Sequence, residues 1–472
     1  MTPSERPLAA SAAGFWREVR AALRGEERDY TAGPVGRAVV LLAIPMMLEM
    51  VMESIFAVSD VFFVARLGPD AVATVGLTES ILTLVFALCM GLSAATTAMV
   101  ARRIGEKDPA GAAVAAVQAI WLGIALSIPV GAAGVLLAPR LLRWMGGSPA
   151  LAAQGWGYTA WVLGGSVTVL LLFLVNAVFR GAGDPAIALR ALWLANLVNI
   201  GLDPCLIFGL GPFPEMGLTG DGLATTIGRG IGVAYQLNAL FRGRGRIDLA
   251  GVSLRLDPGV MWKLIRVSVP GMFQYLIATA SWLGLVRILA LFGSAALAGY
   301  TIALRVIIFV ILPSWGMSNA AATLVGQNLG AGRPERAERS VWLTGLYNMV
   351  FLGSVGLGFI FFAEPVVGLF TADPAVLRQG TACLRIVSYG YCFYAYGMVM
   401  VQAFNGAGDT VTPTTINFFC YWLLQIPLAW LLARRTGLGP DGVYWAIAVA
   451  ESTLAVVGIL AFRRGKWKAK TI

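Results

Sequence analysis

The sequence predicts an all-α polytopic membrane protein with twelve transmembrane helices, arranged as two six-helix lobes related by a parallel pseudo-twofold repeat. Three observations predict this fold class. Apolar residues make up 58% of the 472-residue chain and charged residues only 13%, whereas soluble domains carry about 25% charged residues. Apolar runs of membrane-spanning length recur along the whole chain. The second half of the chain also repeats the first at a fixed offset.

The repeat appears in residues that mark turns and helix breaks. The segment FRGAGDP at 179–185 returns as FNGAGDT at 404–410, which is 225 positions later. Because glycine and proline mark turns and breaks, two stretches that share them share a backbone path. In a membrane protein, two such copies favour a transporter whose site lies between them. The same offset relates further pairs, among them Pro45 and Pro270, Gly68 and Gly293, Gly91 and Gly316, and Gly105 and Gly330.

Each apolar run can cross about 30 Å of hydrocarbon as a helix. Helices are expected throughout, because the backbone polar groups of a span must bond within the segment. The first copy predicts spans at about 37–64, 71–100, 111–138, 154–179, 186–209 and 217–241. The second copy predicts spans at about 260–291, 296–325, 338–362, 379–404, 412–433 and 442–462.

Basic residues predict the orientation in a plasma (inner) membrane. Of the 35 Lys and Arg residues, 25 fall in segments on the side of the two termini and 6 on the other side. Cytoplasmic segments carry this excess, so both termini are predicted to be cytoplasmic. Because each copy has six spans, an even number, the second copy enters the membrane in the same direction as the first, and the two copies are parallel repeats. The predicted parts are a cytoplasmic N-terminal segment (1–36), an N-lobe (37–241), a cytoplasmic linker (242–259), a C-lobe (260–463) and a basic cytoplasmic tail (464–472).

Several function classes are disfavoured by what the sequence lacks. The chain has no histidine, which excludes histidine-based catalysis, metal ligation and proton relays. Its five cysteines form no metal-binding spacing, and no phosphate-binding GxxxxGK[ST] motif occurs. Its basic residues do not form the aromatic-interleaved tracts that hold nucleic acid. We expect no enzyme, catalytic residue, metal or cofactor, and a monomer whose partners are the bilayer and small organic substrates.

Acidic residues inside spans indicate function, because an ionisable group in hydrocarbon is costly. At about 100° per residue, Glu49, Glu53 and Asp60 fall on one face of the first helix. Asn199 and Asp203 are one turn apart in the fifth span, and an Asp beside amides can hold a proton or an oxygen-coordinated ion. We predict that Asp60 and Asp203 face each other and retain a proton, whose loss would let the first helix repack.

Structural roles remain open for these residues. Asp203 could sit at a helix end beside Pro204, and Asp60 could lie near the outer surface. Asn176 and Asn199 could serve as hydrogen-bonding contacts between helices. The aspartates of the two GAGD motifs are expected to cap the following helices; these are Asp184 and Asp409.

A substrate cavity is expected to combine acidic, aromatic and methionine side chains, because flat organic cations are held by stacking and cation–π contact. Most methionine and aromatic residues in a helix bundle serve packing instead. Glu49 and Glu53 could equally pair with Arg287 or Arg305. The candidate cavity residues are Glu53, Glu49, Met50, Gln274, Arg287, Tyr394 and Met398.

Four segments resemble the multidrug and toxic compound extrusion (MATE) transporter family. LAIPMMLEMVMESIFAVSDVFFVARLG resembles the family's first helix, and NAVFRGAGDPAIALRALWLANLVNIGLDPCLIF at 176–208 its fourth and fifth helices. GDGLAT at 220–225 and GQNLGAGRPERA at 326–337 match as well. The resemblance covers about 36–465 and implies export of amphipathic, often cationic organic compounds in exchange for H⁺ or Na⁺, by rocking of the two lobes.

The resemblance also distinguishes between branches of that family. Some bacterial members carry acids in the seventh and tenth helices, where this chain has Ala278 and Tyr394. The DinF-like and archaeal branch uses an N-lobe cluster of Asp, Asn, Asn, Asp and Thr instead. Carried over by motif, that coupling cluster is Asp60, Asn176, Asn199, Asp203 and Thr225, and all five residue types are present. The resemblance therefore implies this branch.

Two other functions compete with a secondary antiporter. A flippase for lipid-linked precursors of the same superfamily would need a strongly basic cavity, which the acidic first helix disfavours. An intramembrane enzyme or receptor is disfavoured because no nucleophile–base arrangement and no additional domain occur.

Overall fold

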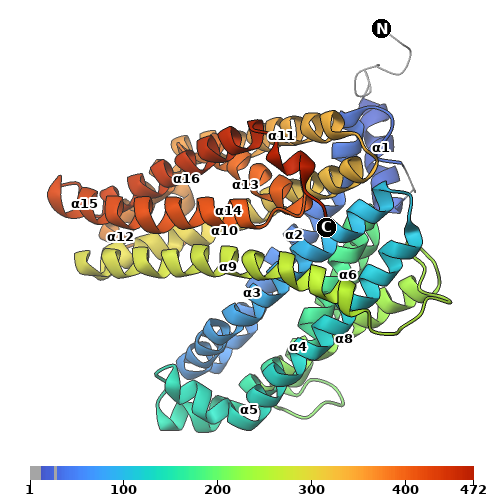
Figure 1. The fold of residues 1–472 in the computed structure, drawn as a ribbon. Coiled ribbons are helices and arrows are strands. Elements are labelled where there is room, and N and C mark those ends of the chain that lie inside the picture. The colour runs from blue at the N-terminus through green and yellow to red at the C-terminus, as the bar shows by residue number, and fades with distance from the viewer. Residues whose placement is uncertain (1–11, 26–28) are drawn as a thin grey trace. The chain divides into compact units, whose positions relative to one another are not determined.

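The computed structural model describes residues 12–25 and 29–472, and all secondary structure within them is helical (Figure 1). A short helix, α1 (Ala12–Arg24), precedes the repeats. The first repeat forms α2 (Val35–Val64), η2 (Ala65–Leu67), α3 (Pro69–Gly105), α4 (Pro109–Trp144), α5 (Pro149–Gly164), α6 (Ser166–Ala182), α7 (Pro185–Phe208) and α8 (Leu218–Phe241). The second repeat forms α9 (Pro258–Leu289), η3 (Ala290–Phe292), α10 (Ser294–Gly330), α11 (Pro334–Gly368), α12 (Pro374–Ser388), α13 (Tyr391–Gly406), α14 (Val411–Asn417), η4 (Phe418–Gln425), α15 (Ile426–Arg435), α16 (Pro440–Arg463) and η5 (Lys466–Ala469).

Every predicted span corresponds to helix in the structure, and within residues 12–25 and 29–472 ten helical segments are long and apolar enough to cross a membrane. The other two spans are α8 and the α12–α13 pair. The fourth span is divided into α5 and α6 at Gly165, and the tenth into α12 and α13 at Tyr389–Gly390. The eleventh contains a π-helical segment, η4, between α14 and α15. The apolar pattern predicts that a span exists but does not encode these internal breaks.

The sequence repeat is also a repeat of geometry. Helices α3 and α10 both have 37 residues, and their bounds are offset by the same interval as the sequence motifs. Gly68 before α3 has φ 102° and ψ 177°, and Gly293 before α10 has φ 97° and ψ 174°. A positive φ of this size is readily adopted by glycine alone. The repeated glycines therefore mark the same turn in both halves.

Close helix crossings are repeated too. A Cβ added to Gly181 in α6 would meet the backbone carbonyl of Thr97 in α3. At the equivalent positions, a Cβ added to Gly406 in α13 would meet the backbone carbonyl of Ala322 in α10. Small residues at helix interfaces in membranes let the backbones approach closely. These glycines therefore set the spacing of the central helix pair in each half.

The chain divides into two compact units. The N-terminal unit is built mainly from Leu48–Met272, and the C-terminal unit mainly from Asp29–Met47 and Phe273–Ile472. Their boundaries fall inside the long helices α2 and α9, whereas the lobes predicted from the sequence meet at the loop 242–259. The apolar pattern of a sequence does not show where one long helix passes from one compact unit to another. The lobe limits 37–241 and 260–463 therefore group the predicted spans and stay predictions.

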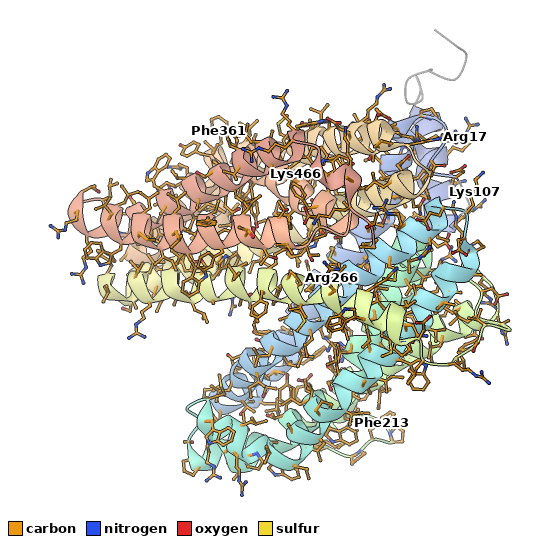
Figure 2. All side chains as sticks on the ribbon, viewed as in Figure 1. Arg17, Lys107, Phe213, Arg266, Phe361 and Lys466 are labelled. Atoms are coloured by element: carbon orange, nitrogen blue, oxygen red, sulfur yellow. The ribbon has the colours of Figure 1, made fainter. Side chains whose placement is uncertain are left out.

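Burial separates inner helices from outer ones. The share of residues that are buried in the most apolar stretch differs from helix to helix. This share is 72% in α3 and in the α5–α6 segment, but only 22% in α4, α9 and α11. Phe361, on α11, projects away from its bundle and is 72% exposed (Figure 2). Exposed apolar side chains on this scale indicate contact with lipid rather than water. The protein is therefore a membrane protein.

The capping prediction for Asp184 is wrong. Asp184 does precede α7, but its side chain makes no capping hydrogen bond to that helix. Its Oδ2 instead accepts from the backbone N–H of Arg246, in the loop after α8, at 2.7 Å. Asp409 lies one residue before Thr410, the N-cap of α14, and its Oδ2 accepts from the Thr412 hydroxyl at 2.7 Å.

Candidate functional site

Three carboxyl groups meet inside the N-terminal unit. Asp60 in α2, Asp203 in α7 and Asp221 in α8 each offer one oxygen, and these oxygens all lie within 4.8 Å of one another. Asp203 and Asp221 are fully buried, and Asp60 is partly buried. The structure therefore brings Asp60 and Asp203 together. It adds Asp221, which the sequence analysis did not assign. We call these three residues the acid cluster.

Two neutral side chains line the acid cluster. The Nδ2 of Asn199 donates to Oδ1 of Asp203 at 3.0 Å and contacts Oγ1 of Thr225 at 3.0 Å. Asn199 and Asp203 are one turn apart on α7, and Asp221 and Thr225 are one turn apart on α8, so each helix presents one polar face. A Cβ added to Gly228 would meet the α7 backbone, so this glycine lets the two polar faces approach closely.

Several oxygens of this site are buried without a donor. Among the described residues, Oδ2 of Asp203, both carboxyl oxygens of Asp221 and Oδ1 of Asn199 have no hydrogen-bond partner. Buried acceptors almost always have a donor in native proteins, and an unpaired buried charge is more costly still. The arrangement therefore needs protons on the carboxyl groups or a cation bound by these oxygens.

One basic side chain lies on the same face of α8. Arg229 follows Thr225 by one turn, is buried, and its guanidinium carbon is 5.5 Å from the centre of the Phe56 ring. With all groups ionised, three carboxylates would face one guanidinium among the side chains that the structure describes. A buried excess of negative charge is strongly unfavourable. Charge balance therefore favours uptake of a positive ion as well.

Asn176 does not join the acid cluster. Its Nδ2 donates to Oε1 of Glu49 at 2.9 Å, and its Oδ1 accepts from Nε2 of Gln236 at 2.6 Å. Glu49 is 1% exposed and also pairs with Arg180, at 3.2 Å. The ion-pair partner of Glu49 is thus Arg180 on α6. It is neither Arg287 nor Arg305, the two partners that the sequence analysis considered. We call Glu49, Asn176, Arg180 and Gln236 the buried ion-pair network.

The predicted cavity residues are distributed over both units. In the N-terminal unit, Glu49 belongs to the buried ion-pair network, and Glu53 and Met50 are half-buried. Oε2 of Glu53 accepts from Nδ2 of Asn196 at 3.5 Å. In the C-terminal unit, Gln274, Tyr394 and Met398 are half-buried, whereas Arg287 is exposed in the last turn of α9. Within the residues described, neither unit alone gathers these seven side chains into one pocket.

Sequence reasoning missed Asp221 although a signal was present. Asp221 is part of the GDGLAT segment and precedes Thr225, which was assigned, by four residues. Residues four apart share one face of a helix, so this spacing alone places an acid beside Thr225. Arg229 follows by the same spacing. In the sequence, the fifth span with its Asn and Asp shows the more obvious polar face.

Comparisons with known proteins agree with this architecture. The family model described as MatE matches residues 45–205 and 270–431, one match in each half. The chain is 26% identical to the "Probable multidrug resistance protein NorM" of Thermotoga maritima, over 93% of this chain and 94% of that protein. It is 24% identical to the "FAD transporter" of Shewanella oneidensis, over 91% and 94% of the two chains.

A solved structure extends the likeness to three dimensions. A MOP superfamily transporter from Pyrococcus furiosus superposes on this chain with a TM-score of 0.86 at 26% sequence identity. The alignment covers 96% of this chain and 99% of that one. The work on that structure describes its binding pocket as having reverse polarity. Since the family model matches more than half of the chain, in both repeats, this protein is a membrane transporter rather than an enzyme and belongs to the MATE family.

Proposed function

We propose that this transporter exports amphipathic, mainly cationic organic compounds in exchange for H⁺, or for Na⁺ in its place, and that the acid cluster binds the coupling ion. The observation that carries the proposal is the set of buried oxygens of Asp203, Asp221 and Asn199 that lack donors among the described residues. A carboxyl triad with one nearby guanidinium cannot stay fully ionised in a protein interior. Binding and release of a positive ion there is therefore coupled to a large change in local electrostatics.

The position of the acid cluster links its charge to the packing of α2. Asp60 belongs to α2, while Asp203 and Asp221 belong to the closely packed pair α7 and α8. Neutralising the cluster removes repulsion between α2 and this pair, whereas ionisation restores it. An ion can shift a conformational equilibrium only by its difference in affinity for the two states. A cluster shared between α2 and its neighbours supplies such a difference, and exchange would proceed by rocking of the two lobes.

The substrate class is inferred from charge and from relatives. Half-buried Glu53 gives α2 an acidic side chain that is not paired within the buried ion-pair network, which suits cationic compounds. Names of relatives point to multidrug resistance, while one names FAD, an anionic flavin nucleotide. A flippase for lipid-linked precursors remains the alternative within the superfamily. Asp60, Asn199, Asp203 and Thr225, which meet at the acid cluster, support assignment to the DinF-like and archaeal branch, whereas Asn176 contacts Glu49 instead.

Topology and assembly complete the proposal. The excess of basic residues on the side of the termini supports a plasma (inner) membrane location with both termini in the cytoplasm. The coupling cluster is built from one chain, which supports a functional monomer. Its ligands are then the lipid bilayer, small organic compounds and the coupling ion.

Transport by purified protein in liposomes tests this proposal. We expect an imposed pH gradient, or a Na⁺ gradient if Na⁺ is the coupling ion, to drive a fluorescent organic cation across the membrane. The organic cation should move in the direction opposite to the flow of the coupling ion. The same vesicles should not transport labelled FAD or flip a labelled polyprenyl-phosphate lipid. Absence of organic-cation movement under both gradients, with movement of either of the other compounds, would overturn the proposal and identify the competing function.

A further inference from the structure

A second acidic group is buried in the C-terminal unit, outside the acid cluster. Glu451 lies near the middle of α16, eleven residues after Pro440 and twelve before Arg463, and is 8% exposed. Because α16 spans the membrane, this places a carboxyl group near the bilayer midplane, where ionisable side chains are rare and usually functional. The sequence analysis did not assign it, and the proposed coupling cluster does not use it.

Glu451 is not a copy of the acid cluster. The repeat places Leu285 at the position of Asp60, and none of the residues from Gln425 to Leu428, the range that offsets of 222 to 225 allow for Asp203, is acidic. The last helix of each half begins after equivalent glycines, Gly217 (φ 55°, ψ −137°) and Gly439 (φ 58°, ψ −136°), and this alignment places Val443 at the position of Asp221. None of the positions equivalent to the acid cluster is therefore acidic in the second half, which carries an acid of its own.

The carboxyl group of Glu451 is held by an unusual piece of backbone. The hydroxyl of Tyr421 donates to it, at 3.1 Å from Oε1 and 3.4 Å from Oε2. Tyr421 belongs to the π-helical segment η4, whose last residue, Gln425, accepts from the hydroxyl of Ser281 at 2.7 Å. π-Helical turns are rare and occur frequently at functional sites. Here the π-helix places the buried side chains of Tyr421 and Gln425 on the side of Glu451.

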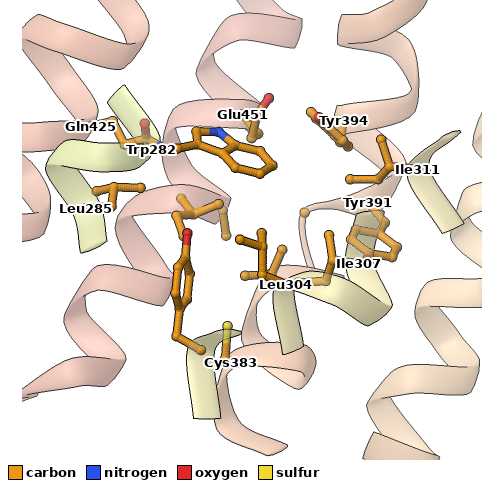
Figure 3. A pocket seen from close by; sticks show the side chains of 15 residues that line it. Trp282, Leu285, Leu304, Ile307, Ile311, Cys383, Tyr391, Tyr394, Gln425 and Glu451 are labelled. Atoms are coloured by element: carbon orange, nitrogen blue, oxygen red, sulfur yellow. The ribbon is translucent and has the colours of Figure 1, made fainter. Parts of the chain in front are cut away.

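A small cavity opens beside this carboxyl group (Figure 3). Its volume is about 40 Å³, enough for about one water molecule. Glu451, Gln425 and the rings of Trp282 and Tyr394 surround one end of it (Figure 3). The hydroxyl of Tyr391, which also lines the cavity, is buried and has no hydrogen-bond partner among the described residues. The cavity is therefore lined by a second buried polar group besides the carboxyl group of Glu451.

No basic side chain lines this cavity, so Glu451 has no opposite charge beside it in the described structure. The titratable groups around it are hydroxyls and thiols: Tyr300 from α10, Cys383 from α12, Tyr391 and Tyr394 from α13, and Cys420 and Tyr421 from η4. Arg287 and Arg305, on α9 and α10, are exposed and do not line it. An isolated buried carboxylate is most readily neutralised by a proton.

We propose that Glu451 is a second proton-binding site of this transporter, located in the C-terminal unit and served by the water-sized cavity beside it. The assignment to coupling rests on the proposed antiport function. A proton suits the site better than Na⁺, because most side chains lining the cavity are apolar and a bound Na⁺ needs several oxygen ligands. Exchange would then move one proton more per cycle than the acid cluster alone provides.

Infrared difference spectroscopy of the full-length protein in liposomes, recorded between two pH values, tests proton binding directly. We expect wild-type protein to show carboxyl C=O bands that appear on acidification and shift in D₂O. Glu451→Gln should remove one of these bands and leave the bands that Asp203→Asn removes. The matched control is Tyr444→Phe, a buried tyrosine on the same helix that does not line the cavity, which should leave the spectrum unchanged.

Tyr421→Phe provides a second variant that keeps Glu451. Because the tyrosine hydroxyl stabilises the ionised carboxylate, its loss should increase the protonated fraction at neutral pH and shift the frequency of the Glu451 band. If neither Glu451→Gln nor Tyr421→Phe alters a titrating carboxyl band, the proposal is wrong. A band that responds to Na⁺ at fixed pH would also overturn it and indicate a cation site.

Transport stoichiometry separates this proposal from the function on which it rests. If wild-type protein exchanges protons for an organic cation, Glu451→Gln should lower the ratio of protons to substrate by one. An unchanged ratio would remove Glu451 from coupling while the antiport function stands. If wild-type protein shows no exchange, the proposed function fails, and the infrared titration still decides whether Glu451 binds a proton.

Discussion

At the scale of single residues, Asp221 tests whether the acid cluster acts as a triad. Its two oxygens lack donors among the described residues, and it lies within reach of Asp60 and Asp203. Replacing it with asparagine keeps its size and removes its charge. We expect Asp221→Asn to reduce gradient-driven transport by about tenfold or more, as Asp60→Asn and Asp203→Asn should, because the ion loses an essential ligand. Initial rates in liposomes measure this.

The control for these variants is Glu364→Gln, an exposed acid on α11 that should transport at the wild-type rate. Each variant must also elute as a folded monomer in detergent. Wild-type transport by Asp60→Asn or Asp203→Asn would contradict the coupling assignment. Wild-type transport by Asp221→Asn alone would reduce the cluster to a pair.

The buried ion-pair network makes a separate prediction about stability. Glu49 is 1% exposed, and Arg180 is its ion-pair partner. Removing one partner of a buried pair leaves an uncompensated charge and costs about 3–5 kcal/mol. We expect Arg180→Ala to lower the thermal unfolding temperature strongly, and Glu49→Gln/Arg180→Ala to recover part of the loss. Thermal unfolding in detergent measures both, and equal destabilisation of the single and double variants would contradict the pairing.

What could be predicted about these residues had a clear limit. Helical periodicity placed Glu49, Glu53 and Asp60 on one face, but it carries no information about which helix lies opposite. The structure shows Glu49 against α6, while Asp60 lies with α7 and α8. Asn176 therefore contacts Glu49 rather than Asp203, although motif and residue type matched the cluster. Neighbours across a helix interface depend on packing that one sequence does not display.

At the scale of helices, the glycine crossings predict where the bundle tolerates no added volume. A Cβ at Gly181 would lie 2.9 Å from the carbonyl oxygen of Thr97. Overpacking of this kind costs about 1–3 kcal/mol. We expect Gly181→Ala, and Gly406→Ala at the equivalent crossing, to lower the thermal unfolding temperature. The control is Gly76→Ala in α3, which meets nothing within 4 Å and should be neutral or stabilising. Equal effects at Gly76 and Gly181 would contradict this account.

The helices themselves were predictable because length and apolarity define a membrane span. Their interruptions were not. Gly165 and Gly390 separate paired helices within single apolar runs, while Gly91 and Gly316 lie inside unbroken ones. Glycine alone therefore does not signal a break. The π-helix at Phe418–Gln425 also lies in an ordinary apolar run. Packing against neighbouring helices decides whether the backbone hydrogen bonds follow the α-helical or the π-helical pattern. The apolar pattern of the sequence carries no information about this choice.

At the scale of the whole molecule, the repeat determines where the compact units divide. The boundaries Met47–Leu48 and Met272–Phe273 are 225 positions apart, the offset of the sequence repeat, and each lies two residues after a proline inside a long helix, Pro45 or Pro270. In the N-terminal unit, Gly91 of α3 packs against the backbone of α9 at Ser268. In the C-terminal unit, Gly316 of α10 packs against the backbone of α2 at Met46. Each repeat therefore contributes the start of one helix to the other unit.

This exchange predicts that the two prolines set the rate of transport rather than its affinity. A proline inside a helix removes one backbone hydrogen bond and permits bending at that point. If the lobes rock during exchange, α2 and α9 must bend where they pass from one unit to the other. We expect Pro45→Ala and Pro270→Ala to slow transport several-fold with unchanged binding of the organic substrate. Pro129→Ala, in the outer helix α4, is the control. Equal slowing by all three variants would show that loss of any helix proline is sufficient, and the unit boundaries would then have no special part in the motion.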